Sequence, residues 1–242
     1  KMSIEEICRK YNIDHYTIMD DGSIDVDGDV LLDDYELTEI PLKFGVVTGD
    51  FYCSDNNLTT LKGCPKEVSG GFYCGHNNLT SLKGSPIEVS DQFDCGVNKL
   101  TSLLGGPKSV GGEFYCSKNK LTDLKGSPKS IGGGFYCRNN QLTTLEYGPK
   151  SIVSNFNCSG NKLTDLKGSP DSVGGNFKCR NNPIGSIFDY VDNYVDIDFL
   201  RTFKTFKVIK DGIVNLKRLK YVMEMFDKPI KIEEIEKYYT IK

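Results

Sequence analysis

The sequence predicts an α/β solenoid, an arc of stacked repeats with short parallel β-strands on its concave face and little helix within the repeats. Phe, Cys, Asn and Leu recur together every 21 residues through the middle of the chain. One such unit is too short to bury its own apolar side chains, so neighbouring units must stack. Prolines keep the same spacing, most of them in a Gly-x-Pro step. That step interrupts regular structure and predicts an irregular Gly/Pro convex side.

Each position of the unit F-x-C-x-x-N-x-L-x-x-L-x-G-x-P-x-x-V has a physical role. Phe and Cys lie two residues apart, so in a strand both side chains point into the core and the residue between them points outward. Asn follows where the chain leaves the strand, and its amide can satisfy buried backbone groups of the turn. The two leucines point back into the core. The phenylalanines are Phe51, Phe72, Phe93, Phe114, Phe135, Phe156 and Phe177.

The segment F-x-C-x-x-N-x-L resembles the L-x-L-x-x-N-x-L core of leucine-rich-repeat (LRR) proteins, with Phe and Cys at the first two leucine positions. The resemblance covers all seven units and implies an LRR horseshoe. The short unit is similar to the compact repeats of bacterial effector proteins, and the version F-Y-C-S-x-N-x-L-T-x-L-x-G-x-P resembles repeat proteins encoded by tailed bacteriophages and their hosts. Tyr147 stands where other units have glycine, which predicts an altered turn.

The repeats divide the chain into three parts. Residues 1–49 are predicted to form an N-terminal cap of helix, β-hairpin and degenerate repeat. Its helix begins at the capping box Ser3-Ile4-Glu5-Glu6, and Asp20-Asp21-Gly22 marks the hairpin turn. Residues 28–49 align with the repeat as the degenerate unit, and residues 50–187 hold the seven regular units.

Residues 188–242 lose the repeat period and are predicted to form a mainly helical C-terminal cap or small domain. Helices are expected at 186–196, 216–226 and 231–239, with a second hairpin around Asp211-Gly212. This part is too short for the ubiquitin-ligase domain that follows the repeats of some bacterial effectors, so that activity is not expected.

Seven of the nine cysteines occupy one repeat column, 21 residues apart. A column of this kind is predicted to be a buried apolar ladder in a reducing compartment rather than a set of disulfides. Cys64 stands outside the ladder and is predicted to be a surface thiol. No CxxC cluster suggests zinc, and His15 and His76 stand alone, which leaves a Cys–His nucleophile unsupported. The sequence therefore predicts no metal, no cofactor and no enzyme activity.

Composition narrows the cellular setting. The net charge of −3 and the pI of about 5.5 argue against a protein whose main partner is nucleic acid. No apolar run approaches the ~18 residues of a membrane span, and no signal peptide opens the chain. The expectation is a cytoplasmic protein, in the host cytoplasm if it is phage-encoded, with no membrane partner.

The outward position of each strand forms the candidate partner-binding column. Its members are Tyr52, Tyr73, Asp94, Tyr115, Tyr136, Asn157 and Lys178, and Glu113, Arg138 and Arg180 flank them. Tyrosine is enriched in binding hot spots, which favours binding. The alternative is that cross-strand tyrosines only support the sheet. The neighbouring columns change sign along the array, a polarity that can orient a partner or simply solvate the face. They begin with Asp50, Asp55 and Glu113 and continue with Lys118, Arg138, Lys178 and Arg180.

The leading hypothesis is a non-enzymatic module that binds a protein partner on the concave Tyr-lined face. The phage resemblance implies that the partner is a bacterial host or defence protein. The first alternative is a nucleic-acid-related protein, in which the basic stretch from Arg201 to Lys220 contacts phosphate or the acidic segment 14–39 mimics it. For both stretches the plainer interpretation is solvation and internal ion pairing. The second alternative is an enzyme in the C-terminal domain.

Overall fold

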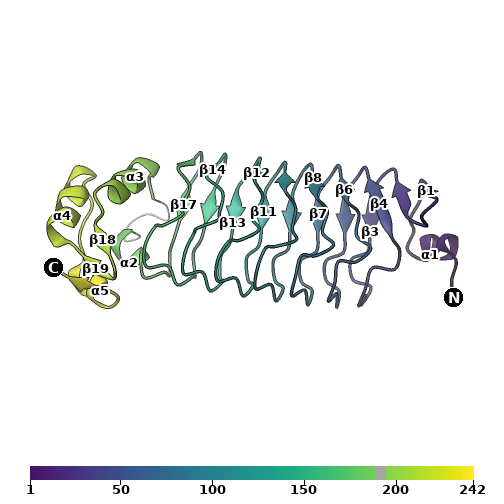
Figure 1. Cartoon of the computed structure of the whole chain (residues 1–242), viewed down its shortest axis with the longest axis horizontal. Coiled ribbons are helices and arrows are strands. Elements are labelled where there is room, and N and C mark those ends of the chain that lie inside the picture. Colours follow the sequence, from purple (N-terminus) through teal and green to yellow (C-terminus); the bar gives the residue numbers. More distant parts are fainter. Residues whose placement is uncertain (189–194) are drawn as a thin grey trace.

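The chain folds as a parallel β-solenoid of about seven turns with little helix. The computed structural model describes residues 1–188 and 195–242. The turns stack in a row between a small N-terminal cap and a helical C-terminal unit (Figure 1). Each repeat turn contributes one strand to a first sheet and one to a second row of strands on the opposite side, and the core lies between them. Within the described residues, no helix has the length and apolar character needed to cross a membrane.

The first sheet contains the Phe column. Its strands are β3 (Val30–Leu31), β5 (Phe51–Tyr52), β7 (Phe72–Tyr73), β9 (Phe93–Asp94), β11 (Phe114–Tyr115), β13 (Phe135–Tyr136), β15 (Phe156–Asn157) and β17 (Phe177–Lys178). All pair in parallel and in register, so each Phe lies on the next. Neighbouring Phe rings stack with centroids 5.3–5.5 Å apart, and every ring is buried. The predicted inward Phe and Cys columns are confirmed.

A second sheet corrects the prediction of an irregular convex side. Its strands are β1 (Tyr16–Ile18), β2 (Ile24–Val26), β4 (Phe44–Val47), β6 (Glu67–Val68), β8 (Glu88–Val89), β10 (Ser109–Val110) and β12 (Ser130–Ile131), followed separately by β14 (Ser151–Ile152) and β16 (Ser172–Val173). In each repeat strand the Val or Ile is buried beside a more exposed polar residue. This alternation is that of a half-buried strand, and β-branched residues favour it. The Gly-x-Pro step is confined to the turn that precedes each repeat strand of the second sheet.

The second sheet is interrupted between β12 and β14. Other turns place a glycine with φ of 83° to 93° where this turn has Tyr147, whose φ is 68°. At Gly84, for example, a Cβ would lie 2.8 Å from the Leu61 backbone oxygen of the preceding turn. A side chain therefore cannot occupy this position at the regular spacing, and β14, the strand that follows Tyr147, does not pair with β12. The altered turn predicted at Tyr147 lies at this interruption.

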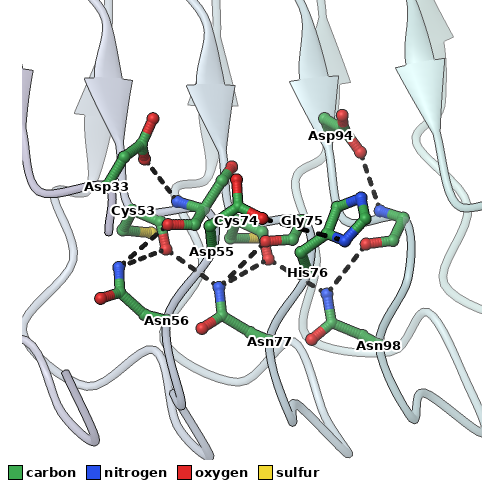
Figure 2. Close-up of polar contacts among 12 residues, drawn as sticks. Asp33, Cys53, Asp55, Asn56, Cys74, Gly75, His76, Asn77, Asp94 and Asn98 are labelled. Atoms are coloured by element: carbon green, nitrogen blue, oxygen red, sulfur yellow. Dashed lines mark hydrogen bonds and ion pairs between the residues drawn. The ribbon is translucent and has the colours of Figure 1, made fainter. Parts of the chain in front are cut away.

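A buried asparagine ladder joins successive turns below the first sheet (Figure 2). The Asn77 amide donates to the carbonyl oxygens of Cys53, Cys74 and Gly75 at 2.9, 3.1 and 3.2 Å. Its Oδ1 accepts from the Leu58 backbone N–H at 2.9 Å. The ladder members are Asn56, Asn77, Asn98, Asn119, Asn140, Asn161 and Asn182. The predicted role of this column, satisfying buried turn backbone, is confirmed.

The N-terminal residues cover the first turn. Helix α1 (Ile4–Lys10) begins after Ser3, whose side chain and that of Glu6 form the reciprocal capping box. Strands β1 and β2 form an antiparallel pair, and β2 continues in parallel into the second sheet through β4. Val30 pairs with Phe51, as the degenerate-unit alignment requires. The Tyr35 backbone N–H donates to Asn56 Oδ1 at 3.0 Å, so the ladder extends into this unit.

Carboxylates of the acidic segment 14–39 bond to the next turn. The pairs are Asp25 with the backbone N–H of Val46, Asp29 with that of Asp50 and Asp33 with that of Ser54, at 2.8, 2.7 and 2.6 Å. Asp21 also forms an ion pair of 2.9 Å with Lys43. Several of the acidic residues in this segment therefore have structural roles where the solenoid begins.

The C-terminal unit covers the other end of the solenoid. Its elements are α2 (Gly185–Phe188), α3 (Ile197–Thr205), β18 (Ile209–Lys210), β19 (Ile213–Val214), α4 (Leu216–Met225), α5 (Ile232–Glu236) and β20 (Thr240–Ile241). Val195 forms an antiparallel bridge with Phe177 of the last strand of the first sheet. The Tyr239 hydroxyl donates to the Thr164 carbonyl oxygen at 2.7 Å. The unit therefore satisfies backbone groups that the last turns would otherwise expose.

The C-terminal helix predictions need correction in two places. Of the helix predicted over 186–196, α2 covers the start, and residues 189–194 lie outside the described residues. Helix α3 was not predicted, because its apolar residues Phe199 and Phe203 stand among lysines and an arginine. Asp196 caps α3 by accepting from Phe199 N–H at 3.2 Å, and both phenylalanines are buried. The predicted hairpin is present as β18 and β19, and β20 adds to it in parallel.

Candidate interaction surface

The side of the first sheet that points away from the core presents the predicted column of partner-binding residues. Because Phe and Cys of each strand point into the core, the residue between them points away from it. In-register pairing places these outward residues side by side on adjacent strands. We call this surface the outer face. It contains Tyr52, Tyr73, Asp94, Tyr115, Tyr136, Asn157 and Lys178.

The four tyrosines form two stacked pairs on either side of Asp94. Tyr52 and Tyr73 stack with centroids 4.7 Å apart and an interplanar angle of 7°. Tyr115 and Tyr136 stack at 4.6 Å and 11°. All four are half-buried. The stacking supports the sheet, as the alternative interpretation expects, and it also holds the exposed ring edges in fixed positions.

Glycines make room for the second ring of each pair. A Cβ at Gly71 would lie 2.6 Å from the Tyr73 ring, and a Cβ at Gly134 would lie 2.9 Å from the ring of Tyr136. These tyrosine rings therefore lie down over their own strands instead of standing out from the sheet. Sequence reasoning missed both glycines, although each stands two residues before a tyrosine.

Carboxylates accompany the tyrosine pairs. The Tyr52 hydroxyl donates to Asp50 Oδ2 at 3.1 Å. Burial, that hydrogen bond and the negative charge of Asp50 raise the pKa of Tyr52 to about 12. Glu113 Oε2 is buried, and no described residue forms a hydrogen bond with it. Burial, and then the Glu113 carboxylate, raise the pKa of Tyr115.

Asp94 occupies the position between the two pairs. Its Oδ1 accepts from the Gly96 backbone N–H at 2.8 Å (Figure 2). Burial raises the pKa of the Asp94 carboxyl, while that hydrogen bond and the charge of His76 act in the opposite direction. His76 itself lies 3.9 Å from the Asp55 carboxylate. Together with Asp50 and Glu113, Asp94 makes this half of the outer face acidic.

The other half of the outer face is basic. Arg138, Lys178 and Arg180 line an open hollow of about 370 Å³ together with Asn157, Ser159 and Asn181. None of the side chains that line it is acidic. Among the described residues, none forms an ion pair with these three cations. Like charges held close together raise the electrostatic energy, which an anionic group in the hollow would lower.

Asn157 is less exposed than the sequence predicts. It was predicted on the exposed column, but it is only 9% exposed. Its Oδ1 accepts from the Ser159 backbone N–H at 3.1 Å, which folds the short side chain onto the strand. Asn157 therefore forms the floor of the hollow. Ser159 and Asn181 were not predicted, although Ser159 belongs to the same repeat column as Arg138 and Arg180.

The cysteine ladder lies behind the outer face and is buried. Burial raises the pKa of the thiols, which is the reverse of what a nucleophilic cysteine needs. The described thiols with this shift are Cys53, Cys74, Cys95, Cys116 and Cys137. Cys64 was predicted at the surface and is buried beside Cys53, so that prediction was wrong. Its repeat counterpart Ser169 is also buried and accepts a hydrogen bond from Lys204, whereas the counterparts Ser85 and Ser127 are half-buried.

Cations of the basic C-terminal stretch bind their own chain. Arg201 forms an ion pair of 3.0 Å with Asp198 and donates to the Asp171 carbonyl oxygen at 3.1 Å. Lys204 Nζ donates to the Ser169 hydroxyl at 3.0 Å. Arg201 and Lys204 thus help attach α3 to the last turns. Among the described residues, no group of three or more His, Cys, Asp or Glu side chains is arranged to hold a metal ion.

Comparison of the chain with protein-family models, curated proteins and solved structures found no match.

Proposed function

We propose that the chain is a non-enzymatic LRR protein whose outer face, the concave face of such solenoids, binds a protein partner. The observation that supports this most is the arrangement of two stacked tyrosine pairs around Asp94. Tyrosine rings held in place lose little conformational entropy on binding, and tyrosine is a frequent hot-spot residue. Seven strands at ~4.8 Å spacing extend the face over roughly 30 Å, enough for an interface of ordinary size.

Charge supports a protein rather than a uniform polyanion as the partner. The outer face is acidic around Asp50, Asp94 and Glu113 and basic around Arg138, Lys178 and Arg180. A nucleic acid lying along the whole face would meet repulsion over its acidic half. A protein surface with the opposite charges at its two ends is attracted to both halves of the face, and the two attractions fix its orientation.

The second candidate function is nucleic-acid binding, and one observation favours it. The basic hollow offers two arginines and a lysine, and phosphate is a common ligand of such groups. The C-terminal stretch supports it less, because Arg201 and Lys204 bond within the chain. Mimicry by the acidic segment is also less favoured, because Asp25, Asp29 and Asp33 bind backbone of the next turn.

The source of the partner follows from the resemblance of the repeat to phage-encoded proteins. On that basis the partner is a bacterial host or defence protein that the chain sequesters in the host cytoplasm. Nine cysteines without a disulfide are compatible with a reducing compartment. The tyrosine pairs, Asp94 and Glu113 would contact one half of the partner, and Arg138, Lys178 and Arg180 the other.

The test is capture from a bacterial lysate by the immobilised protein. The wild type is compared with Tyr73→Ala/Tyr115→Ala/Tyr136→Ala and with a control, Tyr221→Ala/Tyr238→Ala, which removes exposed tyrosines from the C-terminal unit. We expect one or a few proteins that the wild type and the control retain and the triple variant loses. Equal capture by all three would contradict the proposal. Loss of capture after nuclease treatment, with a steep salt dependence, would instead support the nucleic-acid alternative.

A further inference from the structure

The interruption of the second sheet leaves backbone groups without strand partners. In regular turns the Lys129 N–H donates to Lys108 O at 2.9 Å, and the Gly132 N–H donates to Val110 O at 2.9 Å. The corresponding N–H groups of Lys150 and Val153 form no bond with any described residue. The first sheet remains paired across the same two turns, through Phe135 and Phe156. The loss of pairing is therefore confined to one side of the solenoid, between β12 and β14, whose positions along the row of turns are labelled in Figure 1.

Two sequence departures occur at this interruption. Tyr147 replaces the positive-φ glycine of the other turns, and Val153 stands where the other turns have Ser or Gly. Their exposed fractions are 60% and 66%. A tyrosine in the left-handed region is strained, and an exposed valine adds little stability. Folding alone therefore gives no reason for either residue, and both line the same hollow.

The hollow has a volume of about 490 Å³ and a defined chemistry. Pro128, Pro149 and Ile131 add apolar surface to Tyr147 and Val153. Its charged lining residues are Lys129 and Lys150, and none is acidic. A third lysine, Lys125, places its Nζ 5.1 Å from the centroid of the Tyr147 ring. The site thus combines unpaired strand edges, an apolar floor and a cationic rim.

We propose that this interruption docks an extended segment of a protein partner, in which apolar residues alternate with acidic ones. Such a segment adds a strand to the open edges and supplies the hydrogen bonds that β12 and β14 do not exchange. Its apolar side chains pack on Tyr147 and Val153, and its carboxylates face Lys129 and Lys150. Because side chains of a strand alternate in direction, one segment can meet both requirements. The site is separate from the tyrosine pairs of the outer face.

The experiment uses the full chain and a display library of random dodecapeptides. We expect selected peptides to alternate apolar and acidic residues. Their binding, measured by fluorescence anisotropy, should weaken at least tenfold in Tyr147→Gly/Val153→Ser. These substitutions restore residues used by the other turns, so the variant should fold, and thermal unfolding checks this. Leu104→Ser is the matched control, because it removes another exposed apolar side chain of the repeats and should leave binding unchanged.

Hydrogen exchange distinguishes strand addition from binding through apolar side-chain contacts alone. Bound peptide should slow hydrogen exchange at the amides of Lys150, Val153 and Ser154. The Tyr73→Ala/Tyr115→Ala/Tyr136→Ala variant should bind the peptides like the wild type, which keeps this test independent of the outer face. The proposal is overturned if no peptide is enriched, if the double variant binds equally well, or if binding leaves those amides unprotected.

Discussion

Each asparagine of the ladder substitutes for the regular secondary structure that the turns lack. A turn that leaves a two-residue strand carries backbone groups into the core, where an unpaired polar group is costly. The Asn77 side chain bonds to three carbonyl oxygens and one N–H in two adjacent turns. It therefore stabilises both its own turn and the contact with the preceding one.

Replacing Asn77 with alanine should be strongly destabilising. It leaves several buried backbone groups without partners, each at a cost of roughly 1–3 kcal/mol, so we expect a loss of about 3 kcal/mol or more. This loss is measured as the difference between the free energies of unfolding of the wild type and the variant in urea. Asn57→Ala is the control, because Asn57 is exposed and its side chain has no hydrogen bond with a described residue; its effect should stay within ~0.5 kcal/mol. Similar losses for both variants would contradict the role of the ladder.

At the scale of the element, no strand of the repeats is stable by itself. Each has two residues and pairs only with the same strand of adjacent turns. Close approach between turns is therefore required, and the positive-φ glycines permit it by omitting the Cβ that would meet the preceding backbone. One residue that breaks this requirement, Tyr147, coincides with the loss of pairing between β12 and β14 in the second sheet.

Tyr147→Gly should restore the second sheet. With the Cβ removed, the turn can approach its neighbour, and the Lys150 and Val153 amides should gain protection from hydrogen exchange in the free protein. Protection of the equivalent amides in another turn, such as Lys108 and Gly111, should not change. If exchange at Lys150 and Val153 stays as fast as in the wild type, Tyr147 is not the cause of the interruption.

At the scale of the molecule, the solenoid keeps a continuous column of thiols away from water. Burial raises the pKa of five described ladder thiols above the ordinary value of a cysteine thiol. In the unfolded chain these thiols ionise at their ordinary pKa, while in the folded chain they remain protonated. The contribution of these thiols to the free energy of unfolding is fully present below about pH 9. It is lost as the pH rises further, because the thiols of the unfolded state release their protons first.

Stability should therefore fall steeply between about pH 9 and 10. Each buried thiol contributes a limiting slope of ~1.4 kcal/mol per pH unit. Guanidinium unfolding across this range, under reducing conditions, measures the slope. Cys95→Ala/Cys116→Ala removes two ladder thiols and should give a shallower dependence on pH. A free energy of unfolding that stays constant up to pH 10 would contradict this account.

Much of the candidate site could be predicted because it depends on strand alternation alone. Once Phe51 and Cys53 are assigned to the core, Tyr52 must point outward, and the 21-residue period carries the same assignment to every turn. The exposure of the individual side chains on this face was less predictable. Asn157 folds onto its strand through a hydrogen bond to Ser159, and the tyrosines lie over glycines as stacked pairs. These outcomes depend on local contacts that a period does not encode.

The sequence by itself determined the repeat length, the inward Phe, Cys and Leu columns and the role of the asparagines, because each is a periodic pattern with one physical solution. Only the tertiary structure decided that the Val and Ile column forms a second sheet, that Tyr147 interrupts it, and that three cations line one hollow. A two-residue strand has almost no local signal. It exists only where the neighbouring turn comes close enough to pair, and that distance is set by packing across turns.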